Sequence, residues 1–208
     1  KLLLQYHTIP EQKVSLKILN LDSMASKEIE IEDLGLTSFG FMSKFNFGPG
    51  GQSARSIYED VYSGNHVLEL DLASEELSLL PNIQDLDFDS TDVQQELFEF
   101  QAQDGKQITG RVYTRKGVKP NFVFIRYYGW ISIKNSPEPR EVQMALEMGA
   151  AYVTVDLPGG GERGAQWFLD GSSNRLAMIK NISETSTFMQ EKLSMGPEKI
   201  VAMGRSWG

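Results

Sequence analysis

Apolar and polar residues alternate along the first third of the chain. The alternation is strict over residues 28–32 (Glu-Ile-Glu-Ile-Glu) and 68–72 (Leu-Glu-Leu-Asp-Leu). A period of two gives a strand one buried face and one exposed face, as antiparallel sheets have. Further short runs of β-forming residues, separated by Gly, Asn, Ser and Asp, cover residues 2–6, 14–21, 40–47, 56–62 and 77–80. We therefore expect this part of the chain to be all-β.

A faint internal repeat runs through the same region. Residues 19–22 (Leu-Asn-Leu-Asp) come before an Ala-Ser-Lys-Glu stretch, and residues 68–71 (Leu-Glu-Leu-Asp) come before Ala-Ser-Glu-Glu. The offset from Asp22 to Asp71 covers about four short strands, which is the length of one propeller blade at roughly 40–50 residues. Two unrelated hairpins with similar turns would give the same pattern. We interpret residues 1–88 as the C-terminal blades of a larger propeller, because fewer than two complete blades cannot close a ring.

The pattern changes after residue 80. Residues 81–92 are acidic, turn-rich and aperiodic, and are interpreted as a linker. Two β-rich runs then flank Asp104-Gly105, which is a hairpin signal. Residues 122–127 and 151–155 are almost continuously apolar, as strands buried on both faces are.

Two helices are expected among these later strands. The first opens after Ser-Pro-Glu-Pro at residues 136–139 and ends at Gly149. The second covers residues 176–193. Their apolar stripes are Val142, Ala145 and Leu146 in the first helix, and Ile179, Ile182, Met189 and Leu193 in the second. Strands that alternate with helices predict a parallel sheet with right-handed crossovers, so residues 89–208 are expected to be an α/β domain.

The end of the chain carries a candidate nucleophile. A short β-forming run, residues 200–203, leads directly into Gly204-Arg-Ser206-Trp-Gly208, a G-x-S-x-G pattern. In α/β-hydrolases this pattern is the nucleophile elbow, a tight strand-to-helix turn that presents the serine. The pentapeptide alone also occurs by chance in loops rich in Gly and Ser. The apolar run before it supplies the required context, and Ser206 is therefore the candidate nucleophile.

A second glycine-rich motif follows the run at 151–155. Residues 159–164 (Gly-Gly-Gly-Glu-Arg-Gly) fit the G-x-G-x-x-G pattern of a dinucleotide-binding turn. That interpretation requires a helix directly after the turn, whereas the next long helix is expected only after residues 170–174. The acid about 20 residues further on, Glu184, falls inside a helix rather than at a strand end. We therefore favour a loop whose glycines let the backbone pass close to the nucleophile, and we expect no cofactor.

The composition of the chain argues against several kinds of partner and site. The net charge is −8, and no cluster of Lys or Arg offsets it, which argues against nucleic acid. No apolar run is long enough to cross a bilayer, so no membrane partner is expected. The chain has no Cys, which excludes disulfides, thiolate catalysis and Cys-based zinc sites and favours the cytoplasm over the periplasm.

Several motifs occur together in one order. Residues 104–108 (Asp-Gly-Lys-Gln-Ile) and 126–130 (Arg-Tyr-Tyr-Gly-Trp) come first, and residues 159–167, Asp170-Gly171, Asn181 and the final Gly-Arg-Ser-Trp-Gly follow. This series resembles the prolyl oligopeptidase family of serine peptidases over about residues 93–208. The Gly-Arg-Ser sequence is similar to that of the oligopeptidase B branch. The resemblance implies an α/β-hydrolase domain, a seven-bladed propeller that covers the active site, and short peptides as substrates.

The resemblance also implies a set of site residues. Ser206 is the expected nucleophile, and the backbone N–H of Trp207 is one expected oxyanion donor. The hydroxyl of Tyr128 is the other, with Tyr127 as a competing candidate. Trp130 is expected to line the substrate pocket, although a Trp in such a loop is equally often core. No metal and no cofactor are implied.

The catalytic base and acid are not among these residues. In α/β-hydrolases the acid and the histidine follow the serine, whereas His7 and His66 precede it. We expect both groups beyond Gly208, so that residues 1–208 are a piece of a longer peptidase and inactive alone. Two alternatives stay open: an esterase or acyl hydrolase of the same fold, and a non-catalytic propeller–hydrolase scaffold that serves in binding.

Overall fold

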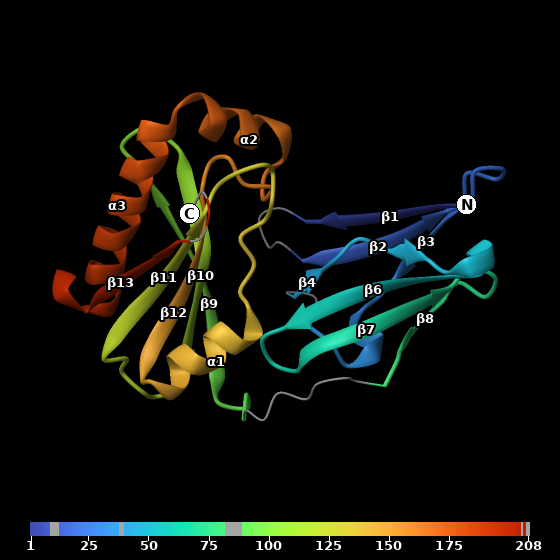
Figure 1. Cartoon of the computed structure of the whole chain (residues 1–208), viewed down its shortest axis with the longest axis horizontal. Helices are drawn as coiled ribbons and strands as arrows, with labels where there is room; N and C mark the ends of the chain where they lie inside the picture. Colours follow the sequence, from blue (N-terminus) through green and yellow to red (C-terminus); the bar gives the residue numbers. More distant parts are fainter. Residues whose placement is uncertain (9–12, 38–39, 82–88, 205, 207–208) are drawn as a thin grey trace. The chain divides into compact units, whose positions relative to one another are not determined.

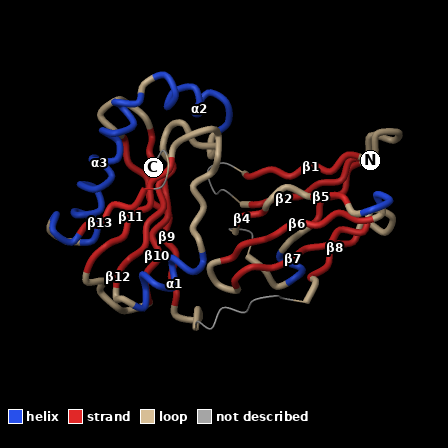
Figure 2. The backbone as a smooth tube through the Cα atoms, viewed as in Figure 1, coloured by secondary structure: helices blue, strands red, loops and turns tan. Residues whose placement is uncertain are grey.

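The computed structural model describes residues 1–8, 13–37, 40–81, 89–204 and 206. The chain forms two compact units, Lys1–Ser90 and Thr91–Gly208, which are described separately (Figures 1 and 2). Three sheets and three α-helices are formed by the described residues. No helix in this part of the chain is long and apolar enough to cross a membrane.

The first unit contains two antiparallel sheets. The first has the order β1-β2-β3, and the second has the order β4-β6-β7-β8 with β5 also paired to β6. Residues 40–47, expected to be one strand, form two strands of two residues each. The strands are β1 (Leu2–His7), β2 (Val14–Leu19), β3 (Ser26–Ile29), β4 (Phe41–Met42), β5 (Asn46–Phe47), β6 (Ser53–Asp60), β7 (Gly64–Asp71) and β8 (Glu76–Leu79).

The apolar residues of the alternating pattern form the core of this unit. In β2 every second residue is buried, and Leu16 is fully buried. Leu68 and Leu70 of β7 are buried in the same way and share one apolar cluster with the β2 residues. Each such aliphatic side chain contributes about 1.5–3 kcal/mol when it is removed from water. The two sheets therefore pack through their apolar faces.

The two turns aligned by the internal repeat share their hydrogen bonding, at a register two residues away from the one read from the sequence. Asn20 Oδ1 accepts the backbone N–H groups of Asp22 and Ser23 at 2.9 and 3.2 Å. Asp71 Oδ1 accepts N–H groups at the same two offsets, both at 2.8 Å. In hydrogen bonding Asp71 therefore corresponds to Asn20 rather than to Asp22, and the assignment of these strands to propeller blades stays a prediction. What recurs is the side-chain oxygen that opens the turn, which either Asn or Asp supplies.

The second unit is built on one mixed sheet of order β13-β11-β12-β10-β9. Strand β11 is parallel to both β12 and β13, as predicted, whereas β10 pairs antiparallel with β12 and β9. Gly105 has φ +82° in the β9–β10 hairpin, which also confirms that turn. The strands are β9 (Val93–Gln101), β10 (Gln107–Arg115), β11 (Phe122–Tyr128), β12 (Ala150–Asp156) and β13 (Ile200–Gly204), and the helices are α1 (Pro139–Glu147), α2 (Gly164–Ser173) and α3 (Arg175–Leu193).

The two faces of this sheet differ in chemistry. On one face Val123, Ile125 and Tyr127 of β11 join an apolar cluster with Met178 and Met189 of α3. The opposite face lies against α1 (Figure 1), whose Val142, Ala145 and Leu146 are buried, and it also carries polar pairs: Glu141 Oε2 accepts hydrogen bonds from Arg126 Nη1 at 2.8 Å and from Tyr152 Oη at 2.5 Å. Alternate residues of a strand point to opposite faces, so both environments meet in β11.

One expectation about the helices was wrong, and a second was right for three of four residues. Residues 164–173 form α2, where a loop was expected, so a helix does follow the glycine-rich turn directly. In α3, Met189 is buried and Ile182 and Leu193 pack against the same apolar cluster, as predicted, whereas Ile179 is 57% exposed and Asn181 and Thr185 are buried. Thr185 is satisfied there because its Oγ1 donates to the carbonyl of Asn181 at 2.7 Å. The buried face of α3 therefore also contains polar residues, which a hydropathy pattern does not identify.

Candidate active site

Ser206 lies in a turn directly after β13, and its backbone is left-handed, with φ +59°. That conformation costs a residue with a side chain about 1–3 kcal/mol and persists only where the surroundings impose it. The preceding strand is fixed by pairing with β11, in which Gly204 lies opposite Tyr127. A serine in a strained turn at a strand end is the local geometry of a nucleophile elbow. Trp207, the expected backbone donor, lies outside the described residues.

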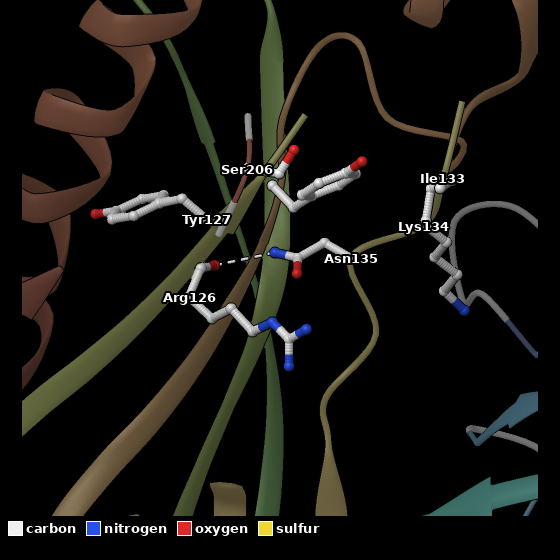
Figure 3. Close-up of a pocket in the computed structure, with 7 residues that line it drawn as sticks. Arg126, Tyr127, Ile133, Lys134, Asn135 and Ser206 are labelled. Atoms are coloured by element: carbon white, nitrogen blue, oxygen red, sulfur yellow. Dashed lines mark hydrogen bonds between the residues drawn. The ribbon is translucent and has the colours of Figure 1, made fainter. Parts of the chain in front are cut away.

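A pocket of about 230 Å³ opens beside Ser206 (Figure 3). It lies at the carboxyl ends of β11 and β13. The chain moves from β11 to β12 in one direction along the sheet and then returns across β11 to β13. In open α/β sheets, ligands bind where the strand order reverses in this way. The pocket is lined by Arg126, Tyr127, Tyr128, Ile133, Lys134, Asn135 and Ser206.

The two candidate tyrosines have different surroundings. Tyr127 is 3% exposed, and its hydroxyl lies 2.9 Å from Ser186 Oγ and donates to Ile182 O at 3.3 Å, both in α3. Burial raises the pKa of Tyr127 to about 12, and its ring points away from Ser206 (Figure 3). Tyr128 is the next residue, so its side chain leaves the opposite face of β11. Tyr128 is half-buried and lines the pocket with Ser206.

Trp130 packs elsewhere in the second unit. Its ring centroid lies 6.3 Å from that of Phe168 in α2, and the guanidinium of Arg175 lies 4.6 Å from the ring centroid. It is not among the seven residues that line the pocket beside Ser206. A contact between Trp130 and substrate stays a prediction.

The glycine-rich turn packs against the loop that follows β11. A Cβ atom added to Gly159 would lie 2.3 Å from the carbonyl oxygen of Gly129, and one added to Gly161 would lie 2.2 Å from that of Ser132. Backbone hydrogen bonds join the same segments, from Ser132 N to Gly159 O at 3.2 Å and from Gly161 N to Ile133 O at 3.1 Å. These glycines serve the close approach of two loops. Although a helix follows directly, the space beside the turn is occupied by the protein's own backbone.

Sequence reasoning missed a cluster of charged groups on the polar face of the sheet. Arg111, Asp156 and Glu162 are buried, and Lys134 is partly buried beside them. Asp156 Oδ2 accepts the hydroxyl of Thr109 at 2.7 Å. Burial raises the pKa of Glu162 to about 8, with the charge of Asp156 as the next cause, and burial lowers that of Lys134 to about 7.

One signal in the sequence pointed to this cluster. Polar residues interrupt the two apolar strands at every second position toward their ends, at Arg126 and Tyr128 in one and at Thr154 and Asp156 in the other. The register pairs these residues directly, Arg126 with Thr154 and Tyr128 with Asp156. A period-two pattern within an apolar run therefore marked a polar face.

Among the described side chains, the imidazole of His66 lies in the first unit, where its Nε2 is 2.8 Å from Ser63 Oγ. The side chain of His7 lies outside the described residues. The position of the catalytic base stays a prediction.

No family model and no curated protein sequence matches the chain. Its fold is similar to that of a prolyl endopeptidase (16% identity, TM-score 0.85, 99% of this chain and 30% of that one). It is also similar to a post-proline cleaving enzyme from Rickettsia typhi (19% identity, TM-score 0.78, 94% of this chain and 28% of that one). A third similar structure is oligopeptidase B from Leishmania major (13% identity, TM-score 0.77, 98% of this chain and 30% of that one). The predicted resemblance to prolyl oligopeptidases is confirmed at the level of fold. The chain spans less than a third of the length of these proteins.

Proposed function

We propose that this chain carries the nucleophile and one oxyanion donor of a serine peptidase of the prolyl oligopeptidase family. The observation that carries the proposal is the meeting of Ser206 and Tyr128 in one pocket, with Ser206 in a left-handed turn at the end of β13. The similarity of fold to prolyl oligopeptidases supports it. Residues 89–208 would then be the N-terminal part of an α/β-hydrolase domain, and residues 1–88 the last blades of a propeller.

The proposed chemistry is acyl transfer. A base supplied by residues after Ser206 removes the proton of its hydroxyl, and Oγ attacks the carbonyl carbon of the scissile peptide bond. The carbonyl oxygen becomes an oxyanion, to which the Tyr128 hydroxyl and the Trp207 N–H donate hydrogen bonds. When the C–N bond breaks, the base returns the proton to the departing amine. Water then releases the acyl group from Ser206 by the same steps in reverse order.

The direct test uses the protein expressed from its complete coding sequence. A fluorophosphonate probe should label Ser206, and a short peptide should be hydrolysed; Ser206→Ala should abolish both without loss of folding. Labelling that survives Ser206→Ala would identify a different nucleophile. Turnover of esters with no peptide cleavage would favour an esterase, and a folded protein with neither activity would favour a binding scaffold.

A further inference from the structure

The loop after β11 is held in a strained conformation. Ile131 has φ +45° and Ser132 has φ +56°, and Ile133 N donates to Trp130 O at 3.2 Å. This is a turn with positive φ at both central residues, which normally requires Asn or Gly there. A β-branched residue in this region is a true outlier. Something outside the turn must therefore hold it, because the local sequence does not favour it.

Asn135 fixes one end of this loop to the sheet. Its Nδ2 donates to the carbonyl of Arg126 in β11 at 2.9 Å (Figure 3) and also to the carbonyl of Val155 in β12 at 3.0 Å. Asn135 is 2% exposed, so both bonds are shielded from water. The carboxamide bridges the two strands at their carboxyl ends, just before Tyr128 and Asp156.

Glu162 in turn fixes Asn135. Its Oε1 accepts the backbone N–H of Asn135 at 2.7 Å, and Glu162 is 5% exposed. The carboxylate is folded back over the glycine-rich turn: a Cβ atom added to Gly160 would lie 2.1 Å from Glu162 Oε2. Because Gly160 has no side chain, the Glu162 carboxylate can occupy this space. The glycine at this position of the motif 159–164 is therefore explained by the contact with Glu162.

We propose that Asn135 and Glu162 are positioning residues that hold the segment 129–135, and with it the Tyr128 side of the pocket, in place for the reaction at Ser206. The inference rests on the proposed function, since it concerns the same pocket. An oxyanion donor acts only within a narrow distance of the developing charge. A misplacement of about 1 Å can cost about 100-fold in rate.

The experiment compares variants that keep or remove the Glu162–Asn135 bond. Glu162→Gln retains the Oε1 acceptor, so its kcat should stay within about threefold of wild type. Glu162→Ala and Asn135→Ala should lower kcat by about 10–100-fold with little change in KM. Gly160→Ala should have the same effect by displacing the carboxylate.

A control separates positioning from loss of stability. Thr185→Val removes another buried hydrogen bond of the second unit, on the apolar face, and should lower Tm while kcat stays unchanged. Amide hydrogen exchange gives a readout independent of activity: residues 129–135 should exchange faster in Glu162→Ala and as in wild type in Glu162→Gln.

Equal kcat and equal loop exchange in Glu162→Ala and wild type would overturn the positioning role. Loss of kcat in Glu162→Gln as large as in Glu162→Ala would also overturn it, because the acceptor is retained there. If wild type shows no labelling of Ser206, the proposed function fails, and the hydrogen-exchange comparison still decides whether Glu162 holds the loop.

Discussion

Tyr127 and Tyr128 are neighbours in the sequence, yet their hydroxyls belong to opposite sides of the sheet. Both residues line the pocket with Ser206, but the Tyr127 hydroxyl is hydrogen-bonded to Ile182 and Ser186 of α3, and the Tyr128 side chain leaves the other face of β11. Because strand residues alternate in direction, this difference is fixed by the backbone of β11 rather than by rotamer choice. Replacing each tyrosine by phenylalanine therefore tests which hydroxyl is the oxyanion donor, with the other tyrosine as the control.

Tyr128→Phe should lower kcat with little change in KM, because an oxyanion donor acts chiefly in the transition state. Loss of such a donor costs about 2.7–4 kcal/mol, or about 100- to 1,000-fold. Tyr127→Phe should leave kcat near wild type and lower the stability by about 1 kcal/mol through loss of a buried hydrogen bond. Steady-state kinetics on a short peptide decides. An unchanged kcat in Tyr128→Phe would remove that residue from the mechanism.

Ile131→Gly should raise the free energy of unfolding of the second unit by about 1 kcal/mol. Glycine adopts the left-handed conformation without strain, and the Ile131 side chain, 54% exposed, gives up little burial. Chemical denaturation measures the difference, with Ile131→Ala as the control that shortens the side chain and keeps the strain. A lower stability in Ile131→Gly than in Ile131→Ala would contradict a strained turn.

Glu162 should make stability fall as pH rises from about 5 to 7. Its pKa is raised from 4.5 to about 8, so over this interval the folded protein keeps a proton that the unfolded chain loses. The pKa of Lys134 is lowered to about 7, so below that pH Lys134 is protonated in both the folded and the unfolded protein. It therefore contributes little to the change of stability over this interval.

The comparison with Glu162→Gln isolates this effect, since the amide does not titrate. Relative to the variant, wild type should lose about 2 kcal/mol of unfolding free energy between pH 5 and pH 7. Denaturation curves at both pH values provide the measurement. A difference that is constant with pH, or that grows in favour of wild type, would show that Glu162 is ionised in the fold.

Substrate size separates the gated peptidase from its alternatives. If residues 1–88 belong to a propeller over the active site, the protein expressed from its complete coding sequence should cleave peptides of up to roughly 30 residues, a limit that the resemblance to prolyl oligopeptidases implies, and the narrow channel of a propeller would restrict access. The same sequence inside a folded protein should resist. The measurement is kcat/KM for the peptide, the folded protein and a matched ester. Equal cleavage of the folded protein would argue against gating.

Most strands could be predicted from the sequence because each is a local pattern. Periods of two and continuous apolar runs gave β2, β7, β11 and β12 within a few residues of their observed bounds. Helix α2 could not be predicted, because Asp-Gly-Ser-Ser at residues 170–173 is typical of a turn. Its helical form depends on tertiary packing: a Cβ atom added to Gly171 would lie 2.2 Å from the backbone of Pro158.

In the candidate site, too, features encoded by contiguous residues could be predicted, whereas contacts between distant residues could not. The position of Ser206 after a strand could be predicted because its motif and the strand before it are contiguous in the sequence, while its role as nucleophile stays a prediction. The bond between Glu162 and Asn135, and that between Thr109 and Asp156, join residues far apart in the chain. No local pattern encodes such pairs, and only the period-two polar positions of β11 and β12 indicated where they would gather.

The two-sided character of the mixed sheet has a consequence for how this protein changes in evolution. Substitutions among apolar side chains on the α3 face alter volume alone, and such cores absorb them one at a time. On the α1 face, a change at Arg126 or Glu141 leaves a partner charge without its counterpart. Homologous sequences should therefore drift freely on the first face and covary in pairs on the second, and those covarying pairs would trace the polar network without a structure.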